Sequence, residues 1–266
     1  MTVHKSRIVS LIAMLMFGAC VNCMAQSVTL KFNTLPSDPS QCLASSLCWK
    51  YEAVNGDLSS ESQAFSAKGD HLLLDTVKMG LWQLGGGDNA YHLGNVPPDK
   101  VVEASHSFSI TVGAKVLDYR HFDYGCKTGD PGCNGPGLQT VNNDQNVSVA
   151  GFCFGAYTGD NGNEVYFVCM SDVTISLGNQ MDHTVAIPFD TTTSHEYRLE
   201  VLPGVGAKLF AKGEQDGAGQ LLLSITPTLR WAGDHNATGL WLGDMTGGAN
   251  AKVEITKFVY ESHARD

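Results

Sequence analysis

The stretch that decides the fold is GFCFGAYTGDNGNEVYFVCM, residues 151–170. Two cysteines, Cys153 and Cys169, flank a segment of glycine, asparagine and aspartate, which are the residues that tight turns favour. If the turn is centred on Asn161, an antiparallel hairpin pairs residues that lie equally far from this centre. Cys153 then faces Cys169, close enough for a disulfide that staples the two arms.

Both faces of this predicted hairpin are apolar or aromatic. Alternation along the arms places on one face Cys153, Gly155, Tyr157, Val165, Phe167 and Cys169. It places on the other face Phe152, Phe154, Ala156, Tyr166, Val168 and Met170. An edge hairpin would show one polar face, so we expect a central position in a sheet. One face then meets the core. The other face is either covered by protein or holds a ligand in a groove, and coverage by protein is the commoner case for aromatic residues.

Other strand signals recur along the chain with turn residues between them. They cover residues 28–34, 71–76, 107–118, 172–178, 184–190, 195–203, 206–213, 220–228 and 251–261. Within HEYRLEV, residues 195–201, apolar and charged residues alternate as in a half-buried strand. No longer segment keeps a capped helical period. The pattern predicts one all-β domain, from about residue 27 to 261, with two antiparallel sheets stacked face to face.

The N-terminus has the pattern of a secretory signal. Lys5 and Arg7 precede the uncharged run 8–19, and small residues precede a cleavage site after Ala25. Residues 1–25 are therefore predicted to be the signal peptide of a secreted or periplasmic protein. The alternative is a lipoprotein, in which FGAC, residues 17–20, ends at a lipid-anchored Cys20. The run is shorter than the roughly 20 residues of a membrane span, and no later stretch qualifies, so we expect no membrane insertion of the mature domain.

Six cysteines follow the predicted signal peptide. An even number in an exported chain predicts disulfides. Short, turn-rich loops and the hairpin register favour the pairs Cys42–Cys48, Cys126–Cys133 and Cys153–Cys169. These spacings lack the CxxC pairs of most zinc sites, so no metal site is predicted at the cysteines.

The charge balance limits the partners. The chain has a net charge of −10, and loss of Lys5 and Arg7 leaves 15 basic residues against 27 acidic ones. Such a surface repels nucleic acid, anionic lipid and acidic polysaccharides. The expected partner is a neutral polysaccharide or glycoconjugate, and no nucleic acid is expected.

The second half of the chain carries a familiar order of pieces. They are FSITVGAKVL at 108–117, the hairpin, the strand HEYRLEV, and LWLGDMTGGANAKVEITKFVYE at 240–261. From about residue 107 to 261 the chain resembles the concanavalin A-like lectin/glucanase superfamily, especially its bacterial extracellular members. The resemblance implies a jelly-roll sandwich that meets carbohydrate, in many members with a structural calcium ion.

Particular residues carry the resemblance. The marker strand of an outer hairpin corresponds to His195, Tyr197, Leu199 and Val201. A Gly-Asp turn and a glycine-rich loop before the last strand correspond to Gly243–Asp244 and Gly247–Gly248. AKGE, where relatives often have Asp-Gly, departs from the pattern.

Catalytic signatures of the superfamily are not found. Retaining glycosidases need two carboxylates about 5–5.5 Å apart. The sequence lacks the Glu-x-Asp-x-x-Glu strand of β-glucanases, and it also lacks the Arg-rich and Gln-x-His strands of alginate lyases. Glu196 and Glu200 share a strand face but are expected to be solvated. The loosest carboxylate candidates are Glu103, Asp123 and Asp244, and the catalytic residues stay unknown. The predicted function is a non-catalytic glycan-binding or surface-adhesion domain, with a glycoside hydrolase or polysaccharide lyase of atypical site, or a structural envelope protein, as alternatives.

Sugar binding needs aromatic platforms and polar partners for hydroxyls. Two stretches interpreted as glycine-rich loops, 80–95 and 229–244, and the segment 119–126 carry such residues. The predicted contacts are Trp82, Asp88, Asn89, Tyr91, His92, Tyr124, Trp231, Asp234, His235 and Asp244. Trp241 is expected on the face opposite Leu240 and Leu242. The segment GDNGNE, residues 159–164, has oxygen ligands for calcium, but a hairpin turn is the favoured interpretation.

Overall fold

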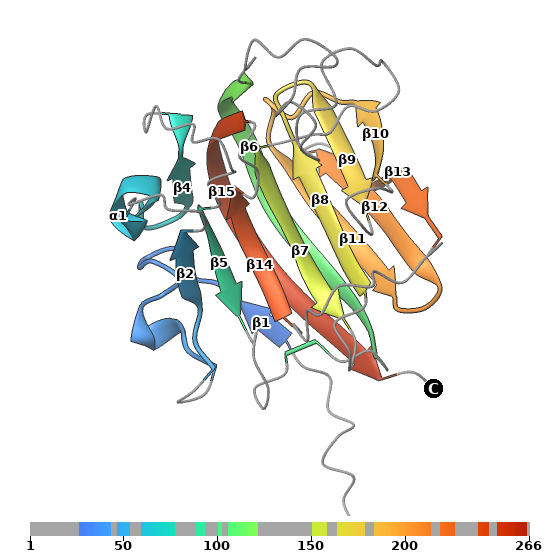
Figure 1. Ribbon diagram of the computed structural model, residues 1–266, viewed down its shortest axis with the longest axis horizontal. Coiled ribbons are helices and arrows are strands. Elements are labelled where there is room, and N and C mark those ends of the chain that lie inside the picture. Colours follow the sequence, from blue (N-terminus) through green and yellow to red (C-terminus); the bar gives the residue numbers. More distant parts are fainter. Residues whose placement is uncertain are drawn as a thin grey trace, which may run out of the picture.

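The strands of this protein form two antiparallel sheets stacked as a sandwich (Figure 1), the fold class that the sequence predicts. The computed structural model describes residues 27–43, 47–53, 60–77, 89–93, 101–102, 106–121, 151–158, 164–178, 184–213, 219–226, 239–244 and 249–264. Outside the strands, this part of the chain contains a short 3-10 helix at Pro39–Gln41 and the one-turn helix α1 (Glu61–Ala64).

The eight-stranded sheet has the order β13-β12-β11-β6-β15-β4-β3, and β1 pairs with β15 outside this path. Its strands are β1 (Ser27–Thr29), β3 (Phe65–Ala67), β4 (Leu72–Asp75), β6 (His106–His121), β11 (His195–Leu202), β12 (Gly206–Gly213), β13 (Gln220–Ile225) and β15 (Ala249–Ala264). Two long strands, β6 and β15, lie side by side at its centre.

The seven-stranded sheet has the order β10-β9-β8-β7-β14-β5-β2. Its strands are β2 (Lys50–Ala53), β5 (Asn89–Leu93), β7 (Phe152–Thr158), β8 (Glu164–Met170), β9 (Thr174–Gly178), β10 (Thr184–Pro188) and β14 (Gly239–Asp244). The predicted hairpin forms β7 and β8, and neither strand lies at an edge. Its central position is confirmed.

The register of this hairpin is also confirmed. Cys153 is the partner of Cys169, Phe154 of Val168, and Tyr157 of Val165. A disulfide joins Cys153 and Cys169, whose Cα atoms are 4.1 Å apart. Turn composition and alternation were therefore sufficient to set which residues face each other.

Two stretches that were interpreted as loops contain strands. Residues 89–93 and 239–244 form β5 and β14, which are neighbours in the seven-stranded sheet. The loop interpretation was wrong there, because both strands are short and either contain glycines or lie beside them in the sequence. Gly243–Asp244, assigned to a turn by the resemblance, instead ends β14.

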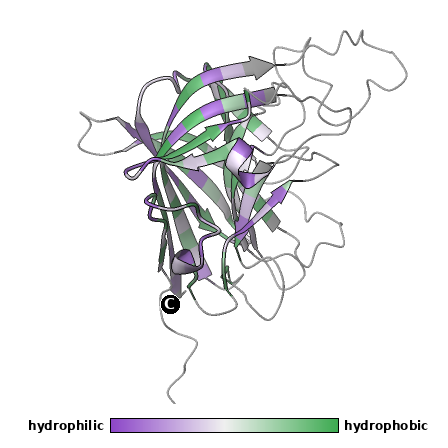
Figure 2. Cartoon of the chain, turned by 90° about the vertical axis from the view of Figure 1, so that its left-hand side faces the viewer, coloured by the Kyte–Doolittle hydropathy of each residue, from purple (hydrophilic) through white to green (hydrophobic). Residues whose placement is uncertain are grey.

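Side chains between the two sheets form the core. In β11, Tyr197, Leu199 and Val201 are buried, as the alternation predicts. On the opposite face of β11, Glu196 pairs with Lys257 and Arg198 lies 3.0 Å from Glu200, with side chains 37–49% exposed. Figure 2 shows hydrophobic and hydrophilic residues alternating along strands of both sheets. This exposure agrees with a solvated role for Glu196 and Glu200.

Disulfides place the described part of the chain in an oxidising, extracytoplasmic compartment. Besides the hairpin pair, Cys42 and Cys48 are joined as predicted. The predicted pair Cys126–Cys133 and the predicted signal peptide lie outside the described residues. No helix in the described ranges is long and apolar enough to cross a membrane.

Candidate functional site

The candidate site is the face of the seven-stranded sheet that points away from the core. Leu240 and Leu242 of β14 belong to the core, whereas Trp241 between them belongs to a separate apolar cluster on the opposite face. Cys153, Cys169, Tyr157 and Phe167 share this cluster. We call Tyr157, Phe167, Trp241 and the Cys153–Cys169 disulfide the aromatic face.

One row of residues crosses this face from strand to strand. Strand register pairs Lys50 with His92, His92 with Trp241, Trp241 with Gly155, Gly155 with Phe167, and Phe167 with Gly178. Neighbouring strands are about 4.8 Å apart. The row therefore brings residues from six strands into direct succession across the sheet.

Three aromatic rings gather along this row. The ring centroids of Tyr157 and Phe167 each lie 6.4 Å from that of Trp241, at interplanar angles of 43° and 39°. Such tilted pairs at this separation are favourable. Tyr157 and Phe167 are half-buried, and Trp241 is 3% exposed. Tyr157 and Phe167 thus offer accessible ring surface, and Trp241 beside them is more deeply buried.

Two glycines make room for these rings. A Cβ added at Gly155 would lie 2.8 Å from Trp241 Cζ2, and one added at Gly178 would lie 2.2 Å from Phe167 Cζ. Contacts this short require the neighbouring atoms to shift, and at Gly155 these include a backbone oxygen as well as the indole, so glycine leaves the room that the rings occupy. Each ring consequently lies across the adjacent strand, close to the sheet.

Polar groups flank the rings on the β5 and β2 side. His92 is 8% exposed, and burial lowers the pKa of its imidazole, while the charge of Glu52 opposes this shift. Among the described residues, His92 Nδ1 and Trp241 Nε1 are buried without a hydrogen-bond partner. Lys50 and Glu52, on β2, are exposed. The face therefore combines aromatic surface with two unmatched polar atoms and a charged end.

Carboxylates are scarce on this face. Among the described strand residues that point outward from the seven-stranded sheet, Glu52 is the one acidic side chain. Hydrolysis by either glycosidase scheme needs two carboxyl groups, about 5–9.5 Å apart. The described residues of the face offer ring surface and hydrogen-bonding groups, and no such pair.

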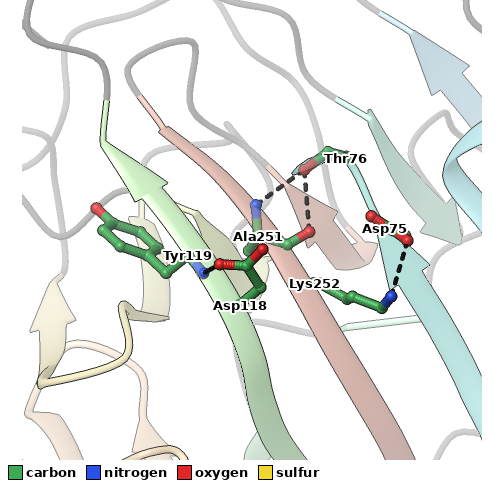
Figure 3. Close-up of polar contacts among 6 residues, drawn as sticks. All are labelled: Asp75, Thr76, Asp118, Tyr119, Ala251 and Lys252. Carbon is green, nitrogen blue, oxygen red and sulfur yellow. Dashed lines mark hydrogen bonds and ion pairs between the residues drawn. The ribbon is translucent and has the colours of Figure 1, made fainter. Parts of the chain in front are cut away.

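Asp244 lies inside the sandwich rather than on the aromatic face. It is 1% exposed, and its Oδ2 accepts a 2.6 Å hydrogen bond from the Thr76 hydroxyl. The same hydroxyl accepts from the Ala251 backbone N–H at 2.9 Å, the contact drawn in Figure 3. Asp244 thereby ties β14 of one sheet to the β4 end and β15 of the other. Its predicted contact with a glycan stays a prediction.

Further groups surround this junction. Lys252 Nζ lies 3.3 Å from Asp75 Oδ2, and Tyr119 stands near the end of β6 (Figure 3). Burial, with the nearby charges of Asp172 and Asp244, raises the pKa of Tyr119. Tyr119 therefore stays neutral at physiological pH, and the junction is a packed structural element.

The other predicted site residues divide between the core, the aromatic face and segments outside the described residues. Tyr91 is fully buried in the core, 4.5 Å from the Phe65 ring centroid, whereas its neighbour His92 points to the other face. Asn89 begins β5, opposite Asp244. The positions outside the described residues are Trp82, Asp88, Glu103, Asp123, Tyr124, Trp231, Asp234 and His235.

Sequence reasoning missed Trp241 as a member of the candidate site. Its alternation against Leu240 and Leu242 was recognised, and so was the apolar face of Cys153, Gly155 and Tyr157. What joins the two observations is the pairing of Trp241 with Gly155, a contact between strands far apart in the chain. No local signal reports that pairing.

The described residues contain no group of three or more histidine, cysteine, aspartate or glutamate side chains that could hold a metal ion. The proposed calcium segment, 159–164, lies almost entirely outside them. A structural calcium ion therefore stays a prediction.

Comparisons with solved structures found neighbours at low sequence identity and with TM-scores below 0.5. Arcelin-5, a lectin-like defence protein from Phaseolus vulgaris, aligns at 11% identity and TM-score 0.44, over 91% of this chain and 99% of its own. The exoplasmic/lumenal domain of VIP36 in its Ca²⁺/Man-bound form aligns at 9% identity and TM-score 0.44, over 89% and 91%. Alginate lyase AlgAT5, of polysaccharide lyase family 7, aligns at 11% identity and TM-score 0.45, over 80% and 94%.

These neighbours have concanavalin A-like folds, which lectins and carbohydrate-active enzymes share. At such identities and TM-scores the likeness carries no argument about ligand or activity. No protein-family model matches the chain, and neither does any curated protein.

Proposed function

We propose that this chain is a secreted glycan-binding or surface-adhesion domain, without catalytic activity, that takes a neutral polysaccharide or glycoconjugate. The observation that carries the proposal is the aromatic face. Tyr157 and Phe167 are half-buried rings on the outside of a sheet, each 6.4 Å from the Trp241 ring. Rings in such a position can stack against the C–H faces of sugars.

Charge supports a neutral ligand. The net charge of −10 disfavours uronates and sulfated glycans. Glu52 adds a further negative charge beside His92. Binding is favoured over hydrolysis because the described residues of the face supply one carboxylate where a glycosidase needs two.

The test is a glycan array, followed by a reducing-sugar assay on every ligand that binds. We expect binding to neutral glycans and no release of reducing ends. Phe167→Ala should weaken binding about tenfold, since stacking and burial of one ring against a sugar contribute on the order of 1–2 kcal/mol. Phe210→Ala is the matched control, because Phe210 is a half-buried ring on the outer face of the other sheet, beside Arg198.

Two predicted platforms outside the described residues enter the same assay. Trp82→Ala and Trp231→Ala should weaken binding by a similar factor while thermal stability stays nearly unchanged. If these variants melt as early as a core deletion and the wild-type protein binds no glycan, the structural envelope role replaces the glycan-binding one. Release of reducing ends from any bound glycan would instead indicate a hydrolase.

A further inference from the structure

The inference concerns two polar atoms that are buried beside the aromatic face. Trp241 on β14 and His92 on β5 are partners in the strand register, so their Cα atoms lie about 4.5–5.5 Å apart. Both side chains are more than nine-tenths buried, and Trp241 Nε1 and His92 Nδ1 lack a hydrogen-bond partner among the described residues. Buried polar groups are normally satisfied, so each such group calls for an explanation.

Other buried polar atoms that lack a hydrogen-bond partner differ from these two in the direction that their side chains face. Trp49 Nε1 and Tyr197 Oη are also buried without a partner, but their side chains belong to the core between the sheets. Trp241 belongs to the outer cluster, and His92 alternates with the core residue Tyr91. Of the described unsatisfied atoms, these two therefore lie on the outward side of a sheet, next to the aromatic face.

We propose that Trp241 Nε1–H and His92 Nδ1 form a polar subsite for the hydroxyl groups of one uncharged sugar unit stacked on the aromatic face. This rests on the proposed function and specifies the ligand contact. The indole N–H can only donate, whereas a neutral imidazole nitrogen can donate or accept. A hydroxyl group does both, so neighbouring hydroxyls of one sugar can satisfy both atoms.

The charged groups that face His92 agree with an uncharged ligand. On one side, β2 presents Lys50 and Glu52, both exposed. On the other side, β14 presents Trp241, which carries no charge. Burial holds the pKa of His92 below its usual value, so the imidazole is neutral at pH 7. A uronate at this position would meet no cationic imidazole, and the opposite charges of Lys50 and Glu52 offset each other.

The experiment is isothermal titration of the full chain with neutral oligosaccharides of glucose, mannose and galactose, and with an oligouronate of equal length. Trp241→Phe keeps a ring and removes the N–H, and His92→Leu removes the imidazole. Each should weaken binding about five- to tenfold, as expected for one lost hydrogen bond in a buried site. Trp49→Phe and Tyr197→Phe are the matched controls, since they remove equally unsatisfied atoms that face the core, and they should leave affinity unchanged.

The outcomes separate this inference from the proposed function. If the wild-type protein binds no member of the panel, both are wrong. If it binds but Trp241→Phe and His92→Leu keep full affinity, or if the oligouronate binds as well as the neutral chains, the subsite is wrong and glycan binding stands.

A second measurement does not depend on the variants folding well. In a ¹H–¹⁵N spectrum of the wild-type protein, the indole resonance of Trp241 should shift on adding the bound oligosaccharide, and that of Trp49 should not. An unmoved Trp241 resonance at saturation overturns the subsite.

Discussion

Removal of the Cys153–Cys169 disulfide should destabilise the protein more than removal of Cys42–Cys48. The two bridges close sequence separations of 16 and 6 residues. In the chain-entropy model, loops of these lengths stabilise the folded state by about 3 and about 2 kcal/mol. The loop lengths alone therefore predict a difference of about 1 kcal/mol.

Packing around the cysteines increases the difference in stabilisation between the two disulfides. Cys153 and Cys169 are 0% and 5% exposed and contact the Trp241 cluster, whereas Cys42 and Cys48 are half-buried. Replacing the buried pair with alanine leaves a small cavity beside the indole, which adds to the lost loop constraint.

Scanning calorimetry of two double variants provides the assay. Cys153→Ala with Cys169→Ala should lower the melting temperature by about 6–12 °C, and Cys42→Ala with Cys48→Ala by about 4–8 °C. A larger loss in the second variant would refute the argument from loop length and burial. Peptide mapping without reduction should find Cys153 joined to Cys169, and any other partner would refute the hairpin register.

Three further predictions concern the glycines, the buried imidazole and the junction between the sheets. Gly155→Ala should destabilise the fold by about 1–3 kcal/mol or more in urea unfolding, because its Cβ would lie 2.3 Å from a backbone oxygen. Gly219→Ala, whose Cβ would meet nothing nearer than 3.5 Å, should be nearly neutral. Below about pH 6.5 an unfolded His92 binds a proton. Burial lowers the pKa of the folded residue, so the folded state binds fewer protons than the unfolded state just below this pH. The free energy of unfolding should therefore fall as the pH drops below about 6.5 and stay level above about 7.5. If His92 is the source, His92→Phe should make this dependence of stability on pH weaker. Thr76→Val removes a hydrogen bond to buried Asp244 and should lower the free energy of unfolding by about 1–3 kcal/mol. An unchanged midpoint of urea unfolding would show that Asp244 does not need this donor.

Local patterns in the sequence predicted the features that depend on near neighbours. The turn at Asn161 and the alternation around it were sufficient for the Cys153–Cys169 pairing. Strands β11 and β12 were located to within a residue, because charged and apolar side chains alternate along β11 and a Pro-Gly turn separates the two strands.

Strands with both faces buried were harder to recognise. β14, with the sequence GLWLGD, has every residue buried, so it shows no alternation of polar and apolar positions. Its glycines also favour a loop interpretation. For β5, burial of His92 beside Tyr91 hides the same period. The two strands were therefore taken for glycine-rich loops and their side chains for loop side chains.

By itself, the sequence determined the all-β class and the central hairpin, because alternation, turn chemistry and disulfide geometry act between residues that are close in the chain. Only the tertiary structure decided that β14 lies between β7 and β5, which brings Trp241 beside Gly155 on one side and His92 on the other. It also decided that Asp244 binds Thr76 inside the sandwich. Such contacts join segments separated by 80 residues or more, and they are selected by the packing of two whole sheets rather than by any local preference.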